Sequence, residues 1–84
     1  MKPNPAVECF WIYTPKAEIN DKWTKLLGKD VAGQGDVHHI PNWPAKHTLD
    51  QLKQMVINKG WNGVTLGKPG VGGPGGGAWF KKMP

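Results

Sequence analysis

The sequence predicts a small α+β domain, in which a curled antiparallel β-sheet packs around a single α-helix. Three observations lead to this class. One stretch carries complete helix start and stop signals, several short aromatic or β-branched runs alternate with turn residues, and a length of 84 residues suits one domain. Cys9 is the only cysteine, so no internal disulfide can form, and the five tryptophans are expected to supply much of the buried surface instead.

The helix is predicted over residues 49–59. Thr48 is a favourable N-cap, and Gln51 stands where its side chain can complete a capping box. Asp50 in the first turn and Lys59 in the last turn both suit the helix dipole, and Gly60 supplies a left-handed stop. Apolar residues recur at helical spacing and should face the sheet: Leu49, Leu52, Met55 and Val56.

The expected strands are short and bounded by glycine, proline or polar turns: residues 9–13, 23–27, 37–40, 61–66 and 78–81. Residues 1–7 are predicted to be an irregular arm before a single domain at 8–84, with a turn at 17–21 and a loop over 29–36. Residues 67–77 contain seven glycines and two prolines. This composition predicts a flexible hairpin loop that contributes nothing to a core.

The formal charge is +5, and all eleven basic residues are lysines. Arginine is the usual residue for bidentate contacts with phosphate or guanine, so the charge favours weak attraction to anionic surfaces over base-specific reading. No apolar run is long enough for a membrane span, and the first residues lack the apolar stretch of a signal peptide. These features suit a cytoplasmic protein, or a protein secreted without disulfides.

Four segments resemble the PAN/apple domain family over residues 28–82: Gly35-Asp-Val, Thr48-Leu-Asp-Gln-Leu-Lys-Gln, Trp61-Asn-Gly-Val-Thr and Ala78-Trp-Phe-Lys. The resemblance implies a curled antiparallel sheet that holds one helix. It also implies a module that binds proteins or carbohydrates and is not an enzyme.

The sequence lacks the cysteines that are typical of that family. Their positions fall on Leu52, Val56, Trp61 and Ala78, which are all apolar here. Packed hydrophobic side chains at the same places would join the same helix and sheet surfaces. The sequence therefore predicts an apolar seam where the resembling family has disulfides.

Catalytic chemistry finds little support in the sequence. Serine is absent, and Cys9 lies in an apolar strand without a cationic neighbour that would favour its thiolate. Side chains that can bind a divalent metal are present at Asp36, His38, His39 and His47. However, adjacent histidines in a strand point to opposite faces, so His38 and His39 cannot both face the same site. We expect no catalytic residue, metal or cofactor. A metal-dependent hydrolase that uses Asp36 and His38 is a distant alternative.

Binding is the favoured function, and Trp43 is its predicted centre, because flanking prolines should hold its ring toward solvent. Trp61 and Trp79 are expected in the helix–sheet core. Polar and charged side chains complete the predicted ligand-binding set: Asn42, Gln34, Asp36, His38 and Lys68. The expected partner is a glycan or another protein. A single-stranded nucleic acid held by lysines and aromatic rings is the alternative, and the oligomeric state is left open.

Overall fold

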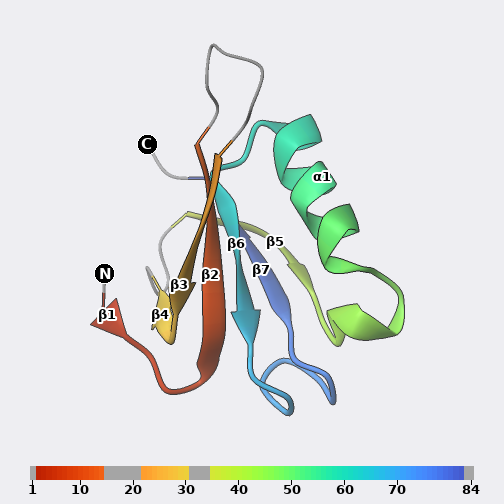
Figure 1. The fold of residues 1–84 in the computed structure, drawn as a ribbon. Coiled ribbons are helices and arrows are strands. Elements are labelled where there is room, and N and C mark those ends of the chain that lie inside the picture. The colour runs from red at the N-terminus through yellow and green to blue at the C-terminus, as the bar shows by residue number, and fades with distance from the viewer. Residues whose placement is uncertain (1, 15–21, 31–34, 83–84) are drawn as a thin grey trace.

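A computed structural model describes residues 2–14, 22–30 and 35–82. Its centre is a five-stranded antiparallel sheet with the strand order β3-β2-β6-β7-β5 (Figure 1). The strands are β2 (Val7–Thr14), β3 (Lys22–Leu27), β5 (Asp36–Ile40), β6 (Gly63–Gly67) and β7 (Ala78–Lys81). One α-helix, α1 (Leu49–Lys59), is present among the described residues and packs on one face of this sheet. The predicted α+β class is confirmed.

The helix begins and ends where its sequence signals predict. Gln51 N–H donates to Thr48 Oγ1 over 3.2 Å, and Thr48 N–H donates to Gln51 Oε1 over 2.9 Å, which completes the capping box. Gly60 takes a φ of 71° at the C-cap, a left-handed conformation that glycine adopts without a Cβ clash. Local chemistry alone accounts for both ends of α1.

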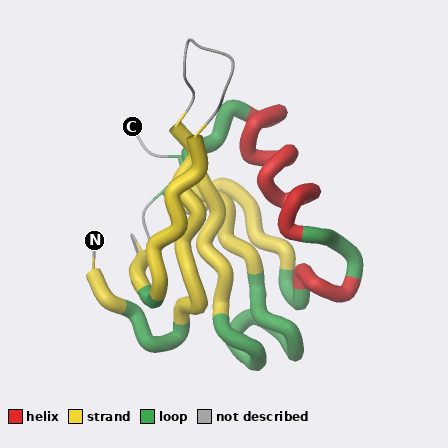
Figure 2. The backbone as a smooth tube through the Cα atoms, viewed as in Figure 1, coloured by secondary structure: helices red, strands yellow, loops and turns green. Residues whose placement is uncertain are grey.

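The core lies between α1 and the sheet. Leu52 and Val56 are the buried residues of the helix, and the sheet contributes Cys9, Val64, Leu66, Ala78 and Phe80 to the same cluster. Trp61 packs against this cluster, half-buried. The predicted apolar seam of Leu52, Val56, Trp61 and Ala78 is therefore confirmed. Figure 2 shows the strands of the sheet running beside one another, with the helix along one side.

The N-terminal residues correct the prediction of an irregular arm. A two-residue strand, β1 (Lys2–Pro3), pairs with β4 (Lys29–Asp30) in a separate two-stranded sheet, and β2 begins at Val7. Asn4 N–H donates to the carbonyl of Gly28 over 2.7 Å, which fastens the turn between β1 and β2. Proline is tolerated in β1 because a short edge strand needs few backbone donors. The turn predicted at 17–21 lies outside the described residues.

The glycine-rich segment contributes no residue to the hydrophobic core cluster, but it packs against neighbouring parts of the chain. Gly76 and Gly77 are buried, and backbone hydrogen bonds join the segment to residues outside it. Asn42 N–H donates to the Gly72 carbonyl over 2.9 Å, and Trp43 N–H donates to the Gly76 carbonyl over 3.2 Å. The flexibility of this segment stays a prediction.

Trp79 explains much of the glycine content of this segment. A Cβ atom on Gly67, Gly72 or Gly77 would lie only 2.7–2.9 Å from the Trp79 ring. Trp79 alternates along β7 with Ala78 and Phe80, which belong to the helix-side core, so its ring lies on the opposite face. There it stacks on His39, with ring centroids 4.6 Å apart and planes inclined by 8°. The prediction that Trp79 lies in the helix–sheet core is wrong.

Candidate binding site

Asn42 and Trp43 lie against the glycine-rich segment, at the start of a 3₁₀ helix, η1 (Trp43–Ala45). Asn42 adopts a φ of 49°, and its Oδ1 accepts a hydrogen bond from Gly75 N–H over 2.8 Å. Trp43 is half-buried and packs against the core cluster. Trp43 is therefore only partly exposed, not held out in solvent as predicted, and it also contributes to packing.

Asp36 and His38 both lie on β5 and make contacts that hold the sheet edge together. The Asp36 carboxylate forms an ion pair with the ammonium group of Lys81, whose side chain is 1% exposed. His38 stacks on Trp61 at a centroid distance of 5.9 Å and packs on Phe80 at 5.6 Å. His38 and His39 point to opposite faces, as predicted from the strand period. Both predicted residues thus have structural partners.

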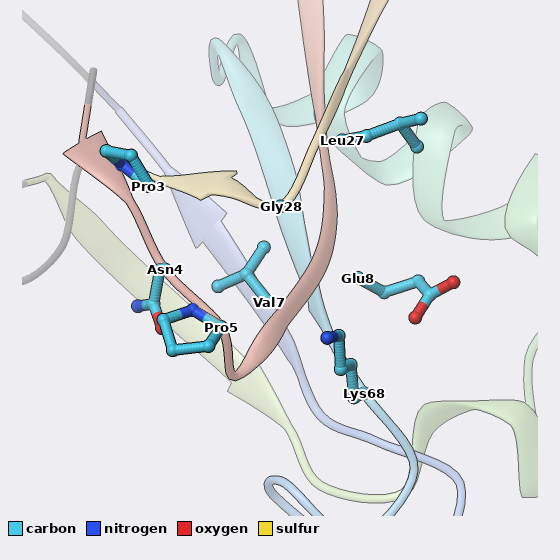
Figure 3. A pocket seen from close by; sticks show the side chains of 8 residues that line it. All are labelled: Pro3, Asn4, Pro5, Val7, Glu8, Leu27, Gly28 and Lys68. Carbon is cyan, nitrogen blue, oxygen red and sulfur yellow. The ribbon is translucent and has the colours of Figure 1, made fainter.

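Lys68 belongs to a different surface. It borders an open depression of about 500 Å³, which is lined by Pro3, Asn4, Pro5, Val7, Glu8, Leu27, Gly28 and Lys68 (Figure 3). None of the other predicted binding residues that the structure describes lines this depression, and Gln34 lies outside the described residues. The structure therefore places Asn42 and Trp43 against the glycine-rich segment, and places Asp36 and His38 on the same strand with different partners, but gathers no single site from the whole predicted set.

Aromatic and lysine side chains gather elsewhere, on the helix-side face of β2 and β3. Trp11 pairs with Lys25 across the two strands, and Tyr13 pairs with Trp23. Successive side chains of a strand alternate between faces, so these four residues share one face. Lys53 reaches the same place from α1. We call these five residues the aromatic–lysine surface.

Ring and charge contacts organise the aromatic–lysine surface. The Tyr13 and Trp23 rings have centroids 5.0 Å apart and planes inclined by 41°. The Lys53 Nζ lies 4.0 Å from the Trp11 ring centroid and 5.2 Å from that of Trp23, and the Lys25 Nζ lies 5.4 Å from the centroid of Trp11. These distances are within the range of cation–π attraction. One indole therefore holds two ammonium groups that come from different elements.

The exposure of this surface leaves it able to meet a ligand. Trp11, Tyr13 and Trp23 are half-buried and pack against the core cluster, so each ring is supported from below and partly open to solvent. Lys25 is exposed and Lys53 is half-buried. Aromatic faces can stack on the C–H groups of a sugar or on a base, and ammonium groups can bind an anion. Supported rings also lose little conformational entropy on binding.

Trp11 and Trp23 fall in the strands predicted at residues 9–13 and 23–27, but the sequence alone does not identify the face on which either ring lies. A signal was present in the spacing, because Trp11 and Tyr13 are two residues apart, as are Trp23 and Lys25. An antiparallel pairing of the two strands would have placed all four on one face. The contribution of Lys53 depends on where the helix crosses the sheet, which the spacing does not give.

Cys9 and the potential metal ligands are the groups that bear on catalytic chemistry among the described residues. Cys9 is buried, and this burial raises the pKa of its thiol, against the opposing influence of the nearby Lys25 charge. Within residues 2–14, 22–30 and 35–82, no three His, Cys, Asp or Glu side chains converge as metal ligands would. In the same ranges, no helix has the length and apolar character that crossing a membrane requires.

Comparisons with known proteins give no relative for this chain: no protein-family model, curated protein sequence or solved structure matches it. The PAN/apple resemblance therefore stays a prediction.

Proposed function

We propose that the chain is a non-enzymatic binding module that holds a carbohydrate on its aromatic–lysine surface. The observation that carries this proposal is the cluster of Trp11, Tyr13 and Trp23, which pack against the core and remain partly exposed to solvent. The electron-rich face of an aromatic ring attracts the slightly positive C–H groups on one side of a sugar ring. A supported ring offers this attraction with little loss of side-chain freedom.

A PAN/apple-like scaffold is part of this proposal. It is supported by the α+β architecture, in which one helix packs on an antiparallel sheet. It is also supported by the apolar seam, since Leu52, Val56 and Ala78 are fully buried at places where the resembling family has cysteines. In this proposal, hydrophobic packing takes over the role of the family's disulfides, and the family's general role in binding is retained.

Single-stranded nucleic acid is the second candidate ligand. The specific observation in its favour is the placement of Lys25 and Lys53 beside Trp11, because such proteins combine positive charge with rings on which bases stack. Stacking of one base on an aromatic side chain is worth about 1–3 kcal/mol. A ligand of this class would lose affinity steeply as salt rises, whereas stacking on a neutral sugar would change little.

The proposal is tested with an array of immobilised oligosaccharides that includes a single-stranded oligonucleotide. We expect Trp23→Ala to weaken the strongest sugar signal by about tenfold or more, since about 1.4 kcal/mol of lost contact gives that factor. Trp43→Phe is the matched control, because it alters a tryptophan outside the aromatic–lysine surface. Circular dichroism and thermal melting report whether each variant is folded.

The outcomes separate the candidates. If Trp43→Phe removes the sugar signal and Trp23→Ala leaves it intact, the ligand lies against the glycine-rich segment and the assignment to the aromatic–lysine surface is wrong. A signal from the oligonucleotide alone would favour the second candidate. A folded protein that binds no sugar on the array contradicts the proposal itself.

A further inference from the structure

We infer that the aromatic–lysine surface selects acidic sugars, with Lys25 and Lys53 as the residues that recognise the carboxylate of a uronic acid. This inference rests on the proposed carbohydrate function and names the class of sugar. It starts from the position of the two ammonium groups, which both lie beside the ring of Trp11.

The two ammonium groups already lie against aromatic rings in this structure. A lysine in solvent samples many rotamers, and fixing it against a ligand costs conformational entropy. The Lys53 ammonium lies 4.0 Å from the centroid of Trp11 and 5.2 Å from that of Trp23, so two rings already restrict it. Lys25 is restricted by its contact with Trp11 at 5.4 Å. Less entropy therefore remains to be lost when an anion binds.

The charges of these lysines are available to a ligand. Within the described part of the chain, the ion pair that the structure contains joins Asp36 to Lys81, and neither Lys25 nor Lys53 pairs with a carboxylate. An ammonium group over an aromatic ring retains its positive charge and its donors toward solvent. The aromatic–lysine surface therefore presents two cationic groups next to rings that can stack on a sugar.

A cationic ligand fits this surface poorly. Clusters of aromatic rings do bind quaternary ammonium groups elsewhere, and Trp11 and Trp23 would form part of such a cluster. Here the Lys53 ammonium lies 4.0 Å from the Trp11 centroid and 5.2 Å from that of Trp23, and the Lys25 ammonium lies 5.4 Å from that of Trp11. An incoming cation would be repelled by both ammonium groups, whereas an anion is attracted by both.

The inclination of the rings favours a sugar over a nucleic acid strand. Consecutive bases that remain stacked on one another lie nearly parallel. The planes of Tyr13 and Trp23 are inclined by 41°, so two stacked bases cannot lie flat on both rings. A sugar ring needs only one supported aromatic face, and a carboxylate at its edge can reach a neighbouring lysine.

The test compares three probes in titration calorimetry at low salt: an oligogalacturonic acid, its methyl ester, and a sulfated oligosaccharide of similar length. The methyl ester keeps the sugar rings and removes the charge. We expect the acid to bind at least about tenfold more tightly than the ester, with a smaller ratio at high salt because counterions screen exposed charges. The wild-type protein should also prefer the acid to the sulfated probe.

Variants assign this preference to residues. Lys25→Gln and Lys53→Gln keep most of the side-chain stem and remove the charge, so each should reduce the acid-to-ester ratio several-fold while the affinity for the ester changes little. Lys59→Gln, in the last turn of the same helix, is the matched control for the loss of one net charge. Its acid-to-ester ratio should equal that of the wild type.

Failure of this inference differs from failure of the proposed function. If the acid and the ester bind equally, or if the control lowers the ratio as much as Lys53→Gln, the carboxylate assignment is overturned while carbohydrate binding stands. Tighter binding of the sulfated probe overturns the assignment to uronic acids. If the folded protein binds none of the probes and no sugar on the array, both proposals are overturned together.

Discussion

Truncation of Leu52 tests the helix–sheet seam most directly. Leu52 is 0% exposed and lies in the core cluster with residues from β2, β6 and β7. Leu52→Ala removes three carbon atoms, and at about 0.8 kcal/mol for each buried methylene the transfer contribution alone is about 2.4 kcal/mol. The cavity left behind adds to this loss, so the free energy of unfolding should fall by about 3–4 kcal/mol.

The assay is equilibrium urea unfolding followed by tryptophan fluorescence and far-ultraviolet circular dichroism. A loss of this size is a large fraction of the stability expected for an 84-residue domain, which is about 4–12 kcal/mol. The midpoint should therefore move to much lower urea, with the slope of the transition retained. At about 4–8 °C for each kcal/mol, the melting temperature should fall by more than 10 °C.

Gln54→Ala is the matched control for this variant. Gln54 lies on the same helix, is exposed, and donates to Asn58 Oδ1 over 2.8 Å at the surface. Its truncation should cost no more than about 0.5 kcal/mol. A loss below about 1 kcal/mol for Leu52→Ala, or equal losses for both variants, would refute the placement of Leu52 in the seam.

Two further predictions concern the glycine-rich segment and the cysteine. Gly77→Ala should cost about 1–3 kcal/mol in urea unfolding, because the added Cβ would lie 2.7 Å from His39 Nε2 and 2.9 Å from the Trp79 ring. Gly70→Ala meets no atom within 4 Å and should show only the cost of a non-glycine residue at a φ of 93°; a larger loss there than at Gly77 would contradict the packing argument. Cys9 should react with a thiol reagent at pH 8 far more slowly in the folded protein than in urea, because burial both shields the sulfur and raises the pKa of its thiol. Equal rates in the two conditions would show that β2 opens readily.

The helix was predictable because all its determinants are close in the sequence. Thr48, Gln51 and Gly60 fix its ends through contacts within one turn, and the apolar spacing of Leu52 and Val56 fixes its buried face. The main strands were predictable to within about two residues for a similar reason, since alternation and turn residues are also local. The pairing of β1 with β4 depends on residues far apart in the sequence, and it was missed.

The glycine-rich segment and the aromatic–lysine surface required information that composition does not contain. Seven glycines in eleven residues are typical of a flexible linker, and only the position of the Trp79 ring shows why several side chains are excluded there. The aromatic–lysine surface depends on the pairing of Tyr13 with Trp23 and on the crossing of Lys53 over β2 and β3. Trp43 was assigned to solvent from its prolines, whereas tertiary packing decides its burial.

The apolar seam between α1 and the sheet has a consequence for how the domain responds to its surroundings. A fold held by disulfides gains or loses stability with the redox potential, because reduction opens the covalent links. Here Leu52, Val56 and Ala78 join the same surfaces by hydrophobic contact, and the one thiol, Cys9, has no partner within the chain. The folding equilibrium should therefore be the same with and without a reductant. Production of the domain under oxidising or reducing conditions should therefore need no oxidative refolding step.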